Sequence, residues 1–136
     1  MKFIFKILLI FISSTGYGLC YEGTPEKQIE AFFDELKTGE VESALTNLYS
    51  SNPLIGTKSQ ELLLMKQQIE GATTFFGKYV GYEKIRYEKL SDSLIVAVYL
   101  AKYENHPMSW EFFFYKPNNK WIISAGRFGD RFQYID

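Results

Sequence analysis

Cysteine and histidine are almost absent from this chain. Cys20 is the only cysteine and His106 the only histidine among 136 residues. A single cysteine has no partner for a disulfide within the chain, so no disulfide framework can hold the fold. The same scarcity excludes zinc sites built from clustered histidine and cysteine and argues against catalytic triads built on histidine. We therefore expect no metal site, no cofactor and no catalytic residue.

Long hydrophobic runs are absent too. One short run near the start of the chain covers residues 7–12, after Lys2 and Lys6, and small or polar residues follow it at 13–16. This run is far shorter than the roughly 20 residues of a membrane-spanning helix. A basic end, a short apolar core and small residues after it are the parts of a secretory signal peptide. We predict that residues 1–20 are removed, that the protein is exported to the periplasm or the medium, and that no stable membrane anchor remains.

The end of this segment has features of two kinds of signal cleavage. Gly16 and Gly18 have the spacing of the small residues that precede a general signal peptidase site, and Gly18 with Cys20 fits that spacing less well. In a lipoprotein, Cys20 would become the acylated first residue. Leu19 stands where a lipoprotein signal has a small residue, and Tyr17 where an aliphatic one is usual. We therefore expect cleavage without acylation of Cys20.

Acidic residues only slightly outnumber basic ones, 16 to 15. The net charge is −1, and loss of Lys2 and Lys6 with the signal would shift it to about −3. A nucleic-acid-binding domain would show a clustered basic surface, so we expect no nucleic-acid partner. Residues 21–136 have the length of one small domain. Aromatic residues make up 18% of the chain, which indicates a core or a cavity lined by rings.

Helical periodicity fills the first half of this domain. Thr24, Pro25 and Glu26 have the order of a helix start: a capping hydroxyl, a proline at the first position and an acid in the first turn. Apolar residues recur at helical spacing from there to a stop at Gly39, and again over residues 41–49. A third, longer helix is expected up to Phe76, with a capping box of Thr57 and Gln60 at its start.

From Tyr82 onward the hydrophobic period changes from 3.6 to 2. This change predicts four antiparallel strands joined by short turns, at residues 82–90, 93–104, 109–116 and 120–128. Two-residue loops would place Lys102 opposite Glu111, a favourable cross-strand pair. The predicted fold is therefore α+β: three N-terminal helices packed on a curved antiparallel sheet of about four strands.

Alternation divides the strand residues between two faces. One face has the large rings and few charges, and we assign it to the helices: Ala97, Tyr99, Tyr103, Trp110, Phe112, Phe114, Trp121 and Ile123. The other mixes apolar and charged residues, as an open face or a subunit contact would: Val98, Leu100, Lys102, Glu111, Phe113, Tyr115, Ile122 and Ser124. We predict a homodimer interface on this second face, formed by Phe113, Tyr115 and Ile122.

The predicted order of elements is three helices followed by long antiparallel strands, and the aromatic stretches 99–107 and 110–117 have Lys120 and Trp121 after them. In both respects the chain resembles the NTF2-like (cystatin-like) superfamily and its small exported bacterial members. The resemblance implies a cone in which a curved sheet wraps a long helix. It carries no catalytic signature. The superfamily includes isomerases and dehydratases such as ketosteroid isomerase and scytalone dehydratase, together with polyketide cyclases and many non-catalytic binding or dimerising modules.

The enzymes of that superfamily use Asp, His or Tyr inside the cone, so residues of these types are candidates for catalytic groups. Asp34 lies off the apolar stripe of its helix, and His106 precedes Pro107 at a hairpin tip. We interpret both as surface residues, and Lys102 with Glu111 as a surface pair rather than an acid–base couple.

The aromatic residues offer two readings: they fill the core, or they line a ligand cavity whose polar contacts come from tyrosine hydroxyls. Arg86 and Glu88 fall on the same face by alternation and would form a polar mouth. The candidate cavity residues are Tyr49, Phe76, Tyr79, Arg86, Tyr99, Tyr103, Trp110, Phe112, Phe114 and Trp121.

These patterns predict an exported, non-enzymatic NTF2-like domain that binds a partner protein or a small apolar ligand. The alternative is an NTF2-like lyase or isomerase that acts on a hydrophobic small molecule inside the cone. A cavity on the helix-facing side that contains tyrosine together with a buried carboxylate or Arg86 would favour the enzyme. A packed interior without an ionisable group would favour the binding domain.

Overall fold

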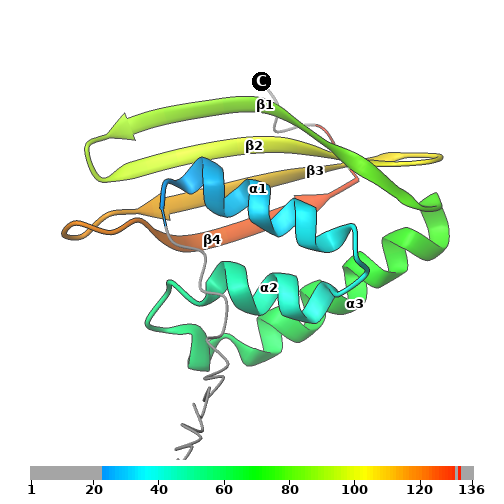
Figure 1. Ribbon diagram of the computed structural model, residues 1–136, viewed down its shortest axis with the longest axis horizontal. Helices are drawn as coiled ribbons and strands as arrows, with labels where there is room; N and C mark the ends of the chain where they lie inside the picture. Colours follow the sequence, from blue (N-terminus) through cyan, green and yellow to red (C-terminus); the bar gives the residue numbers. More distant parts are fainter. Residues whose placement is uncertain (1–22, 131, 133–136) are drawn as a thin grey trace, which may run out of the picture.

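A computed structural model of the chain describes residues 23–130 and 132. The predicted signal peptide, residues 1–20 with Cys20, lies outside the described residues. Figure 1 shows three helices followed by an open, curved antiparallel sheet, which confirms the predicted α+β class. The elements are α1 Pro25–Leu36, α2 Val41–Tyr49, the 3₁₀ turn η1 Ile55–Thr57, α3 Ser59–Phe76, β1 Tyr79–Ser91, β2 Leu94–Tyr103, β3 Pro107–Tyr115 and β4 Ile122–Gly129.

The start of α1 is as predicted, whereas the start of α3 is not. Thr24 accepts a hydrogen bond from the backbone N–H of Lys27, and Pro25 occupies the first turn. The predicted capping box at Thr57 and Gln60 is wrong, because α3 begins at Ser59 without a side-chain cap. The Thr57 hydroxyl instead donates to the carbonyl of Leu54 and closes the turn η1.

The four strands form a meander in the order β1-β2-β3-β4. The predicted pairing of Lys102 with Glu111 is wrong: Lys102 lies opposite Pro107, and Glu111 lies opposite Val98. The turn between β2 and β3 is centred on Glu104 and Asn105, two residues before the expected turn at His106 and Pro107, and this moves the register by four positions. An even slip returns every side chain to its predicted face, whereas a slip of one residue would reverse them all. The assignment of faces in β2 and β3 therefore holds although the register does not.

Arg86 and Glu88 depart from the predicted faces. Alternation from Tyr82 places both on the helix-facing side, but a β-bulge interrupts β1 between Lys84 and Arg86. A bulge inserts an extra residue and reverses the alternation beyond it. Arg86 lies opposite Val98 and Glu88 opposite Val96 on the outer face, whereas Tyr87 packs against the core. The prediction that Arg86 and Glu88 form the mouth of a helix-side cavity is therefore wrong.

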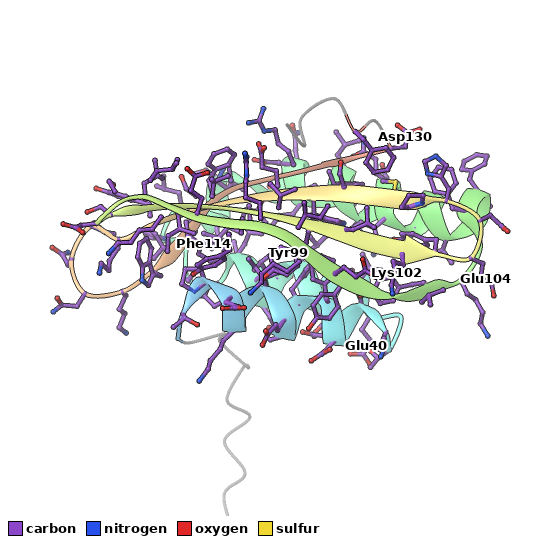
Figure 2. The ribbon with its side chains drawn as sticks, turned by 90° about the horizontal axis from the view of Figure 1, so that it is seen from above. Glu40, Tyr99, Lys102, Glu104, Phe114 and Asp130 are labelled. Carbon is purple, nitrogen blue, oxygen red and sulfur yellow. The ribbon has the colours of Figure 1, made fainter. Side chains whose placement is uncertain are left out.

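The hydrophobic core lies between the sheet and the helices. Figure 2 shows Tyr99 and Phe114 on the side of the sheet that α1 covers. Phe32 and Phe33 of α1 are fully buried and enter this layer. The ring of Phe32 meets Trp110 edge-on with centroids 5.1 Å apart, and Phe33 stacks on Tyr82 at 4.7 Å. Aromatic pairs of this geometry add to the area burial that holds α1 on the sheet.

Candidate functional site

Most of the predicted cavity residues lie within this packed core. Five of them are at most 1% exposed: Tyr49, Tyr99, Trp110, Phe112 and Phe114. Neighbouring rings touch throughout, as in the stacked pair of Trp110 and Phe112 with centroids 5.4 Å apart. The Tyr99 hydroxyl is buried without a hydrogen-bond partner in the part of the chain that the structure describes. The side chains of α1 thus occupy the space next to these rings.

Two other predicted residues line a small cleft at one end of the core. Tyr79 and Tyr103 meet Glu70 and Thr73 of α3 around a volume of about 250 Å³. The Tyr79 hydroxyl donates to the carbonyl of Phe33 at 3.2 Å. Burial raises the pKa of both tyrosines above the ordinary value. Their hydroxyls are therefore proton donors at neutral pH and not bases.

The remaining predicted residues lie apart from both groups. Phe76 is half-buried at the end of α3, where its ring stacks on His106 at 4.7 Å. Trp121 precedes β4 at the border of the core, and the Lys116 ammonium lies 4.9 Å from its ring centroid. The structure therefore does not bring the ten predicted residues together around one cavity.

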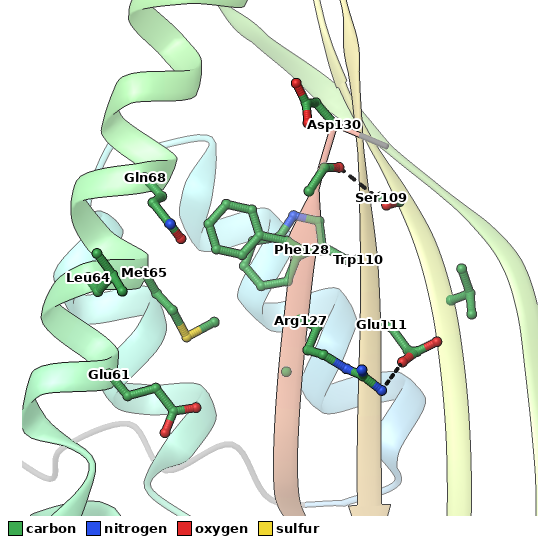
Figure 3. Close-up of a pocket in the computed structure, with 13 residues that line it drawn as sticks. Glu61, Leu64, Met65, Gln68, Ser109, Trp110, Glu111, Arg127, Phe128 and Asp130 are labelled. Carbon is green, nitrogen blue, oxygen red and sulfur yellow. Dashed lines mark hydrogen bonds and ion pairs between the residues drawn. The ribbon is translucent and has the colours of Figure 1, made fainter. Parts of the chain in front are cut away.

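A larger cleft, of about 480 Å³, opens between α3 and the edge strand β4. Figure 3 shows Leu64 and Met65 of α3 facing Phe128 of β4 and Trp110 of β3 across it. The rings of Trp110 and Phe128 are stacked with centroids 4.5 Å apart and form an apolar wall. Gln68 adds an amide to this wall. The volume lies within the range of small-molecule sites.

Leu64 supplies the exposed apolar surface of this cleft. The core stripe of α3 consists of Met65, Ile69 and Ala72. Leu64 lies off that stripe and is 55% exposed, and its neighbour Leu63 is 54% exposed but lies outside the lining. A leucine on the outer side of an amphipathic helix is the sequence signal that points to this site.

The buried Tyr49 contacts two residues that line this cleft, Met65 and Gly126. Its hydroxyl donates to the sulfur of Met65 at 3.9 Å and makes a hydrogen bond with the backbone of Gly126. A Cβ atom on residue 126 would lie 3.0 Å from this hydroxyl, a tight contact that glycine avoids. Burial, followed by the charge of Glu61, raises the pKa of Tyr49, and the Gly126 hydrogen bond acts in the opposite direction. Tyr49 therefore stays protonated.

The first half of the β4 edge is covered by the chain that follows α2. The buried Asn52 donates from Nδ2 to the carbonyl of Ile123 at 2.8 Å, and the Ile123 N–H donates to the Ser51 hydroxyl at 3.2 Å. Asn52 also accepts from the N–H of Leu54 at 2.8 Å. These contacts satisfy edge groups that a further strand would otherwise take. Sequence reasoning treated this segment only as a helix stop and missed its role.

The charged residues around the cleft are mainly acidic. Of the residues that the structure describes, Glu61, Glu111 and Asp130 line it together with one cation, Arg127. Arg127 is paired with Glu111 at 2.8 Å, and Glu61 with Lys58, from outside the lining, at 3.3 Å. Exposed pairs of this kind contribute little to stability, but they set the local field.

The cleft combines an apolar wall, one amide and acidic groups. Within residues 23–130 and 132, no group of three or more His, Cys, Asp or Glu side chains has the arrangement of a metal site. In the same part of the chain, no helix has the length and apolar character to cross a membrane.

Comparison with known proteins adds no relative: no family model, no curated protein and no solved structure matches this chain.

Proposed function

We propose that this protein is an exported, non-enzymatic binding domain of the NTF2-like kind, and that its ligand or partner occupies the cleft between α3 and β4. The observation that carries this proposal is the exposure of Leu64 beside the stacked rings of Trp110 and Phe128, in a cleft of about 480 Å³. Apolar surface left open in a concave site of this size is the usual mark of a ligand pocket.

Binding of a neutral apolar dye tests the proposal. Nile red should gain fluorescence with the wild-type protein, because the cleft gives it a dry apolar wall. Leu64→Arg should weaken the binding about tenfold, since it replaces that wall by a charge. The matched control is Leu63→Arg, on the same helix and at nearly equal exposure but outside the lining. Equal binding by both variants would place the dye elsewhere and remove the support for this site.

The alternative, a lyase or isomerase, has its most suitable groups in the smaller cleft. There Tyr79 and Tyr103 would serve as proton donors and Glu70 as the base. Glu70 is exposed rather than buried, which favours the binding domain over the enzyme. Deuterium exchange at the carbon next to the carbonyl of a small cyclic ketone tests this alternative. Exchange above the buffer rate that Glu70→Gln abolishes would favour the enzyme.

A further inference from the structure

The second half of β4 is an open strand edge beside the apolar cleft. β4 is the last strand of the described sheet, so it pairs with β3 along one edge and with no described strand along the other. Ile123 and Gly126 turn backbone groups away from β3, toward Asn52, Ser51 and Tyr49. In an antiparallel pair, backbone groups point to alternate sides along the strand. Two residues beyond Gly126, Phe128 therefore presents its N–H and C=O to the open edge.

This edge lies next to the surface that a bound side chain would need. Phe128 contributes both the outward backbone groups and one ring of the apolar wall, and Leu64 faces it from α3 (Figure 3). The other rim of the cleft carries Glu111, Arg127 and Asp130. A small apolar molecule would use the wall but leave the backbone groups of Phe128 to water. An extended peptide would use both, since main-chain hydrogen bonds give affinity and pockets for alternate side chains give specificity.

We propose that the ligand of this cleft is an extended basic peptide, which adds to the sheet as a strand beside Phe128 and places apolar side chains toward Leu64 and Trp110. The proposal rests on the proposed function and names the class of its partner. The basic character follows from charge complementarity, because Arg127 is the one cation beside Glu61, Glu111 and Asp130 among the described residues that line the cleft. The contacts of Asn52 with Ile123 and of Tyr49 with Gly126 limit the added strand to the part of β4 beyond Gly126.

Hydrogen exchange at single amides tests the geometry. The probe is a short peptide of alternating lysine and valine, added to the ¹⁵N-labelled protein. Exchange of the Phe128 N–H should slow when the peptide binds, because a new strand protects it. The Arg127 N–H, which points toward β3, should not change. A Phe128 N–H already protected in the free protein would overturn the proposal, since the edge would then be occupied by another part of the chain or by a second copy.

Two control peptides and two protein variants separate the contributions. The same peptide methylated at alternate backbone nitrogens keeps its side chains but loses N–H donors, and it should bind about tenfold more weakly. A peptide with glutamate in place of lysine should also bind more weakly. Leu64→Arg should weaken the lysine–valine peptide, and Leu63→Arg should leave it unchanged. Equal binding of the methylated peptide overturns strand addition, and equal binding of the acidic peptide overturns the basic specificity.

The dye experiment keeps the two proposals apart. If Nile red binds and Leu64→Arg weakens it, while the lysine–valine peptide leaves the Phe128 amide unchanged, the cleft is an apolar ligand site and strand addition is wrong. If neither probe binds, both proposals fall.

Discussion

At the scale of single residues, the contact between Tyr49 and Gly126 joins a helix to the edge of the sheet. Tyr49 is fully buried at the end of α2, and its hydroxyl lies against the backbone of β4. A Cβ atom at position 126 would lie 3.0 Å from this hydroxyl, so any other residue would press against it. A phenol in such a place contributes both packing and a hydrogen bond.

Gly126→Ala should therefore destabilise the fold by about 1–3 kcal/mol, the range for an overpacked site. In a Tyr49→Phe background the same substitution should cost less, because the atom that the new methyl group would meet is gone. Urea denaturation of the four proteins measures both effects as a double-mutant cycle. An equal cost of Gly126→Ala in the two backgrounds would contradict this explanation.

The buried tyrosines also predict how stability changes at alkaline pH. Burial is the main cause that raises the pKa of Tyr49, Tyr79, Tyr99 and Tyr103 above the ordinary value of 10.0. The unfolded chain therefore loses these protons first as the pH rises. Stabilisation from the neutral phenols is complete below pH 10 and is lost above it.

We expect the free energy of unfolding, measured by urea denaturation between pH 8 and pH 11, to fall above about pH 10. Tyr79→Phe should make this fall shallower, although it lowers stability at neutral pH by removing the hydrogen bond to Phe33. The exposed Tyr115→Phe serves as the control. A stability profile that is flat through this range would show that the phenols ionise equally in both states.

At the scale of elements, the packing of α1 against the sheet depends on one tryptophan more than on the other. Trp110 on β3 is 1% exposed and meets Phe32 and Phe33 of α1. Trp121 is only partly buried, because β4 begins at Ile122 and leaves it in the preceding loop. Gln28 of α1 reaches that loop through a hydrogen bond to the Trp121 carbonyl, which any residue could supply.

Trp110→Ala should therefore cost about 3–5 kcal/mol, the range for large aromatic truncations in cores. Trp121→Ala should cost clearly less, since its ring is bordered by the Lys116 side chain rather than enclosed by the core. Denaturation midpoints of the two variants, compared with wild type, decide this. A larger loss for Trp121 would show that the loop, and not β3, anchors the sheet to α1.

At the scale of the whole molecule, the three helices of the described residues all lie on one side of the sheet and leave its outer face uncovered by them (Figure 1). Phe113, Tyr115 and Ile122 lie on this face, in register with Val96 and Leu94 of β2. Tyr115 is exposed, and Arg127 lies 5.5 Å from the centre of the Phe113 ring. Contiguous apolar surface of this kind is typical of a contact between subunits.

We predict a homodimer through this face and a folded monomer for Phe113→Glu. In a two-fold pairing the introduced carboxylate would be buried next to its own copy, whereas in a monomer water solvates it. Sedimentation of wild type and mutant measures the change, and Val80→Glu, at an exposed site in β1, is the control. A monomeric wild type at tens of micromolar would end the prediction.

Export is the other prediction at this scale, and it concerns residues outside the described part of the chain. Protein recovered from the periplasm or the medium should have an intact mass that begins near Leu19 or Tyr21. Full-length protein in the cytosolic fraction would contradict export. A diacylated Cys20 would replace simple cleavage by a lipoprotein anchor.

Local physical chemistry was enough to predict the α+β class from the sequence. Thr24 and Pro25 mark a helix start because apolar residues at helical spacing follow them. The change of hydrophobic period near Tyr82 separates the helices from the strands. The two faces of β2 and β3 also follow from the sequence, because alternation survives a register slip of even length. These features depend on neighbours in the chain, so no tertiary contact is needed to read them.

Only the tertiary structure decided the register, the side on which Arg86 lies and the position of the cleft. The bulge in β1 and the position of the turn between β2 and β3 each depend on how two strands fit together, and no single strand contains that information. The cleft likewise forms between Leu64 and Phe128, which are far apart in the sequence and meet because α3 passes the open edge of β4. Phe32 and Phe33 fill the space beside the sheet rings, since burial of apolar surface favours whichever packing leaves the least of it in water.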